Sequence, residues 1–370
     1  MKKIIEIVPP IFLRNYFSIN KNIRNQRFHD VTLTLRGRDA IALAVQHFGL
    51  QKHDTVLLPA YLCRVIYTPF HNFFTPEFYD IREDLSIDVE TIESILKSRK
   101  IKVLYVIHYF GFLHRNIAQL SKLCKKYGVL LWEDHAHSAL SHFSYDYADA
   151  MLFSFRKLLP IPDGGGLWLA NSSPLSIQGA LASNITSMLI LAKRSRLGMG
   201  KRVRSFLRPV YYHSTASVYK GIKEIIPQPI SYMSKRLIRH SDIESIFNIR
   251  RSIFDIWQEL FSKSRLKPVF SKLPEDVCPQ SFPIWLQIPQ ELRTKLWSFN
   301  VNLRNLWPLD KQMKEKCPTA YELSNSVSPL PIYPGLPQSD MERIMTLLEQ
   351  YGKSPYLNRD INREQRQQAL

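Results

Sequence analysis

Dense runs of apolar residues alternate with amphipathic segments through the first half of the chain. Between the second and third runs, Ile117 and Leu120 share one face of a helix that Gly128 would end. Another helix is predicted from near Arg38 to Gly49. Four runs have the length and apolar density of buried strands: 55–60, 103–108, 128–134 and 150–155. Strands that alternate with helices predict an α/β fold with a mostly parallel sheet flanked by helices.

The second half of the chain has a different pattern. Residues 250–263 have the period of a long amphipathic helix, and residues 280–289 resemble a strand. Residues 337–352 predict a last helix that begins with a capping box of Ser339 and Glu342. Helix, strand, loop and final helix together predict a smaller α+β domain. We expect one large domain and one small C-terminal domain, with these bounds: 1–235 and 236–370.

Composition limits the class of protein. Apolar residues make up 45% of the 370 residues, which is enough for a sizeable core. The four cysteines lie far apart without a C-x-x-C pair, so we predict no metal site and no disulfide scaffold. This cysteine usage, with an N-terminus that lacks a continuous apolar stretch, predicts a cytoplasmic protein. Residues 177–192 are apolar but shorter than a membrane span, and predict a helix that is buried or lies at a membrane surface.

The net charge of +18 is unevenly distributed. Nine Lys or Arg and no Asp or Glu lie between Gly164 and Lys223, and seven of the nine fall within 193–208. Such a segment can bind phosphate groups, either on an anionic membrane surface or on a phosphorylated small molecule, or it can be a solvated basic face. The run has no basic motif with regularly interleaved aromatic residues and no helix-turn-helix is evident, so no specific nucleic-acid partner is predicted. Peripheral contact with an anionic membrane through 193–208 stays open.

Polar residues stand where the predicted strands end. Asp134 ends the third strand, and Ser154 and Lys157 follow the fourth. Gly37 and Arg38 lie at the start of a predicted helix, where free amides and the helix dipole favour a phosphate. Because ligands bind beyond the carboxyl ends of the strands in open α/β sheets, we expect these groups to form one site.

This set of groups fits pyridoxal phosphate. The aldehyde requires an amine, and burial would favour the neutral form of Lys157. The pyridine nitrogen requires a carboxylate to stay protonated, which Asp134 supplies. The phosphate would be held by the amides near Gly37 and Arg38 and by the hydroxyl of Ser154. The sequence therefore predicts pyridoxal phosphate as the cofactor.

These residues give the chain a resemblance to the DegT/StrS sugar aminotransferases, which have the fold type I of pyridoxal-phosphate enzymes. The opening segment 37–63 resembles the family's first helix and its G-D-x-V-I-x-P strand. FYDIREDLSID, VIHYFG and LLWEDHAHS are similar to the family's D-I-D-x-x-T-x-N-I-D, H-x-x-G and V-I-E-D-A-A-Q/H. FSFRK followed by DGGG resembles its FSF…K……EGG, with the same spacing from Lys157 to Asp163. Residues 330–344 are similar to the segment before its last helix.

The resemblance implies the following roles. In the large domain, Lys157 would bind the cofactor aldehyde and move a proton between substrate and cofactor, and Asp134 would hold the pyridinium. His137 would lie near the ring hydroxyl. The remaining cofactor contacts would come from a group of five residues: Gly37, Arg38, Asp39, Cys63 and Ser154.

Two residues are implied as substrate contacts: His108, in the H-x-x-G segment, and Trp307, where the family has an aromatic residue before a proline. The implied reaction takes an amino group, with glutamate as the donor, and gives it to a keto sugar on a nucleotide carrier. Such products serve amino-sugar and polysaccharide biosynthesis. A homodimer is also implied, because the family builds its sites at the subunit interface.

Three departures from the family pattern are evident. The family's segment is longer between its serine and its lysine, so another register would put Arg156, which stays protonated, in the key position. Residues 229–236 lack the asparagine that the family gives to the neighbouring subunit's site. A lysine at 157 argues against the family's dehydratases, which have histidine there. The alternative function is a catalytically altered relative that binds or regulates through its basic surface.

Overall fold

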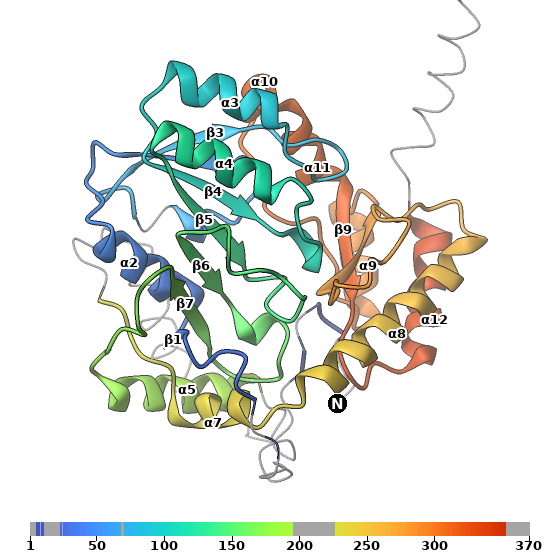
Figure 1. Cartoon of the computed structure of the whole chain (residues 1–370). Coiled ribbons are helices and arrows are strands. Elements are labelled where there is room, and N and C mark those ends of the chain that lie inside the picture. Colours follow the sequence, from blue (N-terminus) through green and yellow to red (C-terminus); the bar gives the residue numbers. More distant parts are fainter. Residues whose placement is uncertain are drawn as a thin grey trace, which may run out of the picture.

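The computed structural model describes residues 5–7, 9–10, 23, 25–67, 70–194 and 226–352 (Figure 1). Its central element is a seven-stranded sheet in the order β1-β7-β6-β5-β4-β2-β3. Five neighbouring strands run parallel, whereas β7 is antiparallel to both β6 and β1. The strands of this sheet are β1 Thr32–Thr34, β2 Thr55–Pro59, β3 Thr75–Tyr79, β4 Val103–Ile107, β5 Leu130–His135, β6 Ala150–Phe153 and β7 Gly165–Leu169.

Helices follow the strands as expected for an α/β fold. α2 packs against β6, β7 and β1, and α4 packs against α3 and β5. Gly128 adopts the left-handed conformation that ends α4, as predicted. The helices of this part are α2 Gly37–His47, α3 Val89–Ser98, α4 Ile117–Tyr127, α5 Ala180–Arg194 and α7 Tyr232–Arg239. The 3₁₀ turns are η1 Arg64–Ile66, η3 Tyr109–Gly111 and η4 Phe155–Lys157.

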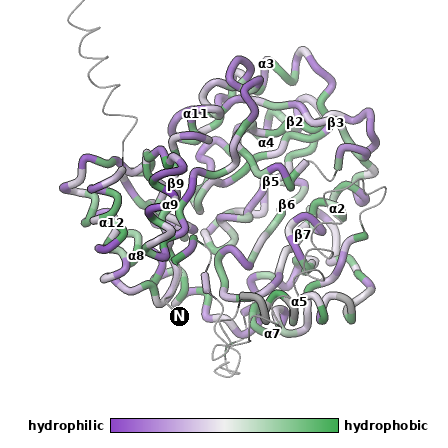
Figure 2. The backbone as a smooth tube through the Cα atoms, turned by 180° about the vertical axis from the view of Figure 1, so that it is seen from behind, coloured by the Kyte–Doolittle hydropathy of each residue, from purple (hydrophilic) through white to green (hydrophobic). Residues whose placement is uncertain are grey.

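A second apolar core lies beside the sheet, where α8 and α12 run together (Figure 2). Phe254 and Trp257 of α8 pack there with Phe282 of a two-stranded antiparallel sheet. Ile5 is buried in the same core and pairs with Val301. This N-terminal residue therefore packs with the second half of the chain. The domain bounds at residues 235 and 236 stay a prediction. The elements here are α8 Ile243–Ser262, β8 Ser281–Trp285, α9 Gln290–Ser298, α10 Met313–Lys316, α11 Pro318–Ser326, β9 Val327–Pro331 and α12 Gln338–Tyr351.

The capping box predicted for the last helix is wrong. The residue before the helix is Pro337, so the helix begins two residues earlier than a cap at Ser339 requires, and Ser339 lies inside its first turn. Gln338 Nε2 instead donates a hydrogen bond of 3.0 Å to the Glu342 carboxylate. The fixed φ of proline suits a helix start, so no side-chain cap is required.

No helix among the described residues is both long and apolar enough to cross a membrane.

Candidate active site

Asp134 lies near the carboxyl end of β5, 6% exposed. Its Oδ2 accepts a hydrogen bond of 2.9 Å from the hydroxyl of Tyr105, on the neighbouring strand β4. Its Oδ1 accepts one of 2.8 Å from the amide of Ala136. These two donors fix the carboxylate in a buried position, and burial makes any further cation or N–H facing it a strong partner.

Lys157 ends the 3₁₀ turn that follows β6. β6 pairs with β5, so the turn comes close to Asp134, and the two charges interact. Burial lowers the pKa of Lys157, while the charges of Asp134 and Cys63 act in the opposite direction. Among the described residues, no hydrogen bond or ion pair engages the Lys157 ammonium group. Arg156 is exposed, so the geometry favours Lys157 over Arg156 as the residue that faces Asp134.

The acid and glycines after Lys157 fix the neighbouring backbone. Asp163, 1% exposed, accepts hydrogen bonds from the Ser231 amide (3.1 Å) and from the hydroxyls of Ser231 (2.7 Å) and Ser234 (2.9 Å). It thus ties the glycine turn to the start of α7. At Gly165, a Cβ would lie 2.3 Å from the carbonyl carbon of Arg36, so only glycine allows β7 to pass the start of α2.

The start of α2 presents several unused donors to this edge of the sheet. The amides of Asp39 and Ala40 bond to the Arg36 carbonyl, whereas no described acceptor bonds the first two amides of the helix, at residues 37 and 38. A Cβ on Gly37 would lie 3.9 Å from Ser154 Oγ, so the hydroxyl is beside the helix start. Arg38 Nη2 is buried without a hydrogen-bond partner. Free amides at a helix start with a hydroxyl beside them favour an anion.

Asp39 is buried at the same helix start, and one of its oxygens has no partner. Burial raises its pKa to about 7, although the charge of Arg36 and backbone amides, including that of Gln228, oppose the shift. A carboxyl that is readily protonated repels a nearby phosphate less than an ionised one would. Its hydrogen bond to the 228 segment indicates that it orients backbone rather than the anion itself.

Aromatic side chains form a wall of the site. Trp307 stacks on His137 (5.6 Å between ring centroids) and meets Tyr61 edge-on (4.8 Å). His137 Nδ1 accepts a 3.2 Å hydrogen bond from the amide of Phe110, and burial together with the charge of Lys157 lowers its pKa. Tyr61 is fully buried, and its hydroxyl has no partner. Trp307 and Phe110 both have positive φ (53° and 56°), a strained backbone that often marks a functional site.

His108 lies on the other face of the sheet. Successive strand residues point to opposite faces, so Glu133 faces away from Asp134. His108 Nε2 is 2.8 Å from Glu133 Oε2, and the His108 side chain is 1% exposed. This position does not fit the predicted contact with a substrate at Asp134 and Lys157. The signal was available in the sequence, because one residue separates the two faces of a strand.

His108, Glu133 and His135 place three ligand-type atoms within 4.8 Å of one another. The tautomer argues against a metal ion there. The His114 amide donates to His108 Nδ1 (3.1 Å), so the single proton of a neutral imidazole is on Nε2 and points at Glu133. A metal on Nε2 would require the ring to lose that proton as well. The three groups are explained as a buried hydrogen-bonded cluster.

The residues present fit pyridoxal phosphate. An amine, a buried carboxylate, unbonded amides at a helix start and the orphaned Arg38 Nη2 lie along one edge of the sheet, as the cofactor's aldehyde, ring nitrogen and phosphate require. Cys63, which is partly exposed, faces the same space through its electrostatic contact with Lys157. Tyr61 and Tyr105 were not predicted: Tyr61 lies just past the end of β2, which was an available signal, whereas Tyr105 lies in the middle of β4.

The basic run at 193–208 lies almost entirely outside the described residues. The side chains of Lys193 and Arg194, at the end of α5, are also outside them.

Comparison with known proteins gives three findings. Residues 28–178 match the model of the DegT/DnrJ/EryC1/StrS aminotransferase family. No curated protein sequence matches the chain. Among solved structures, a sugar aminotransferase, Spr1654 from Streptococcus pneumoniae, in its PLP form, has a TM-score of 0.67 at 15% identity, covering 94% of this chain and 98% of that one.

Other solved structures agree. The aminotransferase TlmJ from Streptoalloteichus hindustanus has a TM-score of 0.65 at 15% identity, covering 93% of this chain and 98% of that one. DesI, solved in the presence of its TDP-sugar product, has a TM-score of 0.63 at 14% identity, covering 94% and 93%. The family match and this shared fold confirm the predicted resemblance and the predicted fold class.

Proposed function

With the match of residues 28–178 to the DegT/DnrJ/EryC1/StrS aminotransferase family as the premise, we propose that the protein is a pyridoxal-phosphate-dependent aminotransferase that aminates a keto sugar carried on a nucleotide. The observation that carries the proposal is the electrostatic interaction between Lys157, in the turn after β6, and Asp134, near the end of the neighbouring strand β5. The lysine has no other described partner for its charge, and burial favours its neutral, nucleophilic form.

When bound, pyridoxal phosphate stabilises negative charge at the substrate carbon and carries the amino group between two substrates. The chain supplies what that chemistry requires. The Asp134 carboxylate holds a proton on the ring nitrogen, and the Tyr105 and Ala136 donors keep that carboxylate in place. The start of α2 and Ser154 hold the phosphate. Lys157 Nζ takes a proton from the substrate carbon and returns it on the cofactor side.

The finer assignments rest on the family resemblance. DesI was solved with a TDP-sugar product, which supports a nucleotide-sugar substrate for this chain. Trp307 stands beside His137 over the site, where it would pack against the sugar. Glutamate as donor, a homodimer with a shared site, and a role in amino-sugar or polysaccharide biosynthesis complete the proposal.

The test begins with the purified protein and added pyridoxal phosphate. We expect a visible absorption band, and the replacement of the keto oxygen by an amino group, detected by mass spectrometry, when keto-sugar nucleotides are supplied with glutamate. Lys157→Ala should abolish both the band and the product. A protein that stays colourless and binds no added cofactor would contradict the proposal.

Arg156→Ala is the matched control, because it removes the adjacent cation without touching the buried amine. The band and the product should both persist in this variant. If Arg156→Ala removes the band and Lys157→Ala does not, the register adopted here is wrong.

A further inference from the structure

Helix α5 exposes its apolar side chains and buries its polar ones. Of the side chains that the structure describes in this helix, Leu181 (76%), Ile185 (52%) and Met188 (67%) are widely exposed. Ser183 (0%) and Ser187 (2%) are buried, and the Ser183 hydroxyl has no partner. The exposed residues are four and three apart, so they form one stripe along the helix. An ordinary surface helix turns such a stripe inward.

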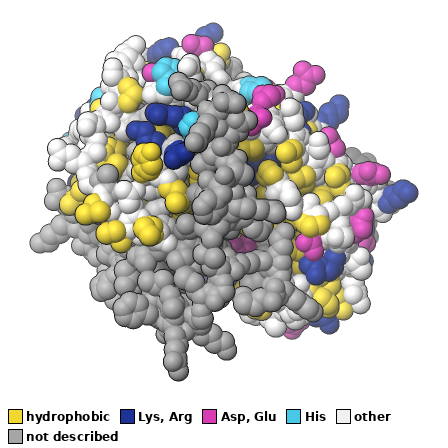
Figure 3. Space-filling model, turned by 90° about the horizontal axis from the view of Figure 1, so that it is seen from below, with side chains coloured by type: hydrophobic (Ala, Val, Ile, Leu, Met, Phe, Trp, Pro, Cys, Tyr) yellow, Lys and Arg dark blue, Asp and Glu magenta, His cyan; other side chains and the backbone are white. Residues whose placement is uncertain are grey.

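Helix α7 lies beside α5 and adds charge to the same surface. The Tyr232 amide donates a 2.9 Å hydrogen bond to Asn184 Oδ1 of α5. Tyr232 is 70% exposed, next to a set of exposed cations on α7: Lys235, Arg236 and Arg239. Figure 3 views the molecule from this side and shows hydrophobic side chains gathered around Lys and Arg.

Acids are nearly absent from this part of the sequence. Between residues 164 and 241 the chain has twelve Lys or Arg and a single acid, Glu224. Neither α5 nor α7 contains Asp or Glu. The surface therefore combines an apolar stripe with a local excess of positive charge.

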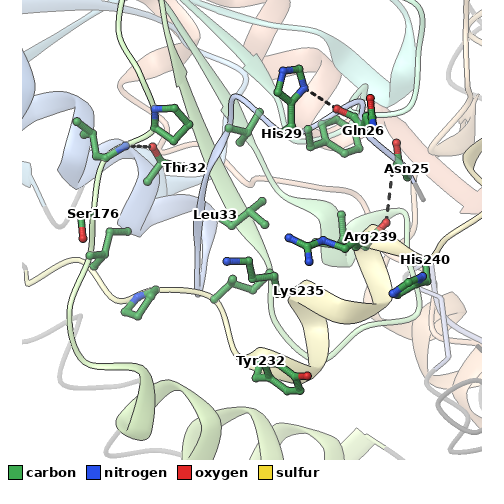
Figure 4. Close-up of a pocket in the computed structure, with 18 residues that line it drawn as sticks. Asn25, Gln26, His29, Thr32, Leu33, Ser176, Tyr232, Lys235, Arg239 and His240 are labelled. Atoms are coloured by element: carbon green, nitrogen blue, oxygen red, sulfur yellow. Dashed lines mark hydrogen bonds between the residues drawn. The ribbon is translucent and has the colours of Figure 1, made fainter. Parts of the chain in front are cut away.

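A groove of about 1060 Å³ opens next to α7. Its walls include Leu33 of β1 and Ile230, and the Lys235 and Arg239 side chains lie at its side (Figure 4). Apolar walls beside two cations suit an acyl chain whose phosphate stays at the rim.

We infer that the surface formed by the α5 stripe (Leu181, Ile185, Met188) and the α7 cations (Lys235, Arg236, Arg239) docks on an anionic lipid bilayer. The stripe inserts among the acyl chains at the interface, and the cations contact lipid phosphates. The helix lies in the plane of the bilayer. This inference does not rest on the proposed aminotransferase activity.

Two other occupants fit the surface less well. A second copy related by a two-fold axis would set the same cations against each other, with no acid in either helix to offset them. A nucleic acid would engage the cations but would leave the aliphatic stripe in water, since base stacking uses aromatic side chains. A bilayer satisfies both the charge and the stripe.

The test is sedimentation of the full chain, loaded with pyridoxal phosphate, with two kinds of vesicle. We expect binding to phosphatidylcholine mixed with phosphatidylglycerol, and little binding to phosphatidylcholine alone. The triple change Leu181→Ser, Ile185→Ser, Met188→Ser should reduce binding about tenfold or more. Lys235→Glu with Arg239→Glu should reduce vesicle binding by a similar factor. Added salt should weaken the binding of the unaltered protein to anionic vesicles.

Matched controls lie elsewhere on the molecule. Trp297→Ser with Phe299→Ser removes exposed apolar residues near α9 (54% and 40% exposed) and should not change binding. Lys122→Glu with Lys125→Glu on α4 should leave most of the binding in place. All of the substituted side chains are exposed, so the circular dichroism of each variant should match that of the unaltered protein.

Three results would overturn the inference. The first is vesicle binding that the stripe variant leaves unchanged. The second is a stripe variant that changes only the oligomeric state measured by light scattering, which would assign the stripe to a second copy. The third is equal binding to neutral and anionic vesicles with DNA binding that depends on Lys235 and Arg239.

Discussion

The two faces of strand β5 carry adjacent buried carboxylates, Asp134 and Glu133, which differ in the groups that surround them. Asp134 takes hydrogen bonds from a neutral hydroxyl and an amide, and still interacts with the free ammonium of Lys157. Glu133, on the other face, has His108 Nε2 at 2.8 Å and His135 Nε2 at 3.3 Å. One carboxylate is held ready for a ligand, while the other is enclosed by protein.

The difference shows how one strand serves both chemistry and folding. Burial alone raises the pKa of a carboxyl, yet the hydrogen bond from His108 and the nearby ring of His135 outweigh burial and lower the pKa of Glu133 to about 2. The Oε2 atom of Glu133 is thus already engaged by protein side chains. The Asp134 carboxylate stays available for binding and catalysis.

The strongest way to break the comparison is Asp134→Asn. The amide preserves shape but cannot hold a proton on the ring nitrogen, so we expect kcat to fall about 1,000-fold, with the midpoint of thermal unfolding of the apoprotein little changed. Steady-state kinetics and thermal unfolding measure the two effects. A variant that keeps its kcat would remove Asp134 from the proposed chemistry.

Glu133→Gln should give the opposite result. Removing the charge from a buried cluster leaves two imidazoles with a weaker acceptor, so we expect a loss of about 3 kcal/mol in the free energy of unfolding. Chemical denaturation measures it. Protein that remains folded should still develop the cofactor band, because Glu133 faces away from the site. Loss of the band in folded protein would show that the two faces are coupled.

The same cluster sets a pH dependence that sharpens the comparison. Burial lowers the pKa of His135 to about 4, so its neutral form is favoured and stability should fall as the pH drops from about 6.5 toward 4. The lowered pKa of Glu133 adds stability that is complete above about 4.5 and disappears as the pH falls toward 2. The free energy of unfolding, measured across this pH range, should depend less on pH below about 4.5 in Glu133→Gln than in the unaltered protein.

Much of this arrangement was predictable from the sequence. Strand-end positions and apolar period located Asp134, Ser154 and Lys157, and family resemblance added Trp307 and His137. The antiparallel strands β1 and β7 were not predicted, because their pairing is set by contacts between residues more than a hundred positions apart. The position of His108 beside Glu133 was not predicted either, since a motif gives residue order but not the face of the sheet.

The smallest expected effect comes from Tyr105→Phe, which removes one of the two donors to Asp134. Burial, with the nearby Asp134 charge, raises the pKa of Tyr105 well above its ordinary value, so the hydroxyl stays protonated and donates. Its loss leaves the Ala136 amide as the remaining described donor, and we expect kcat to fall about fivefold, near 1 kcal/mol. The pH profile should separate this role from packing. Loosening the carboxylate should shift the pH dependence of the cofactor band, whereas a packing defect would lower stability and leave the band's pH dependence unchanged.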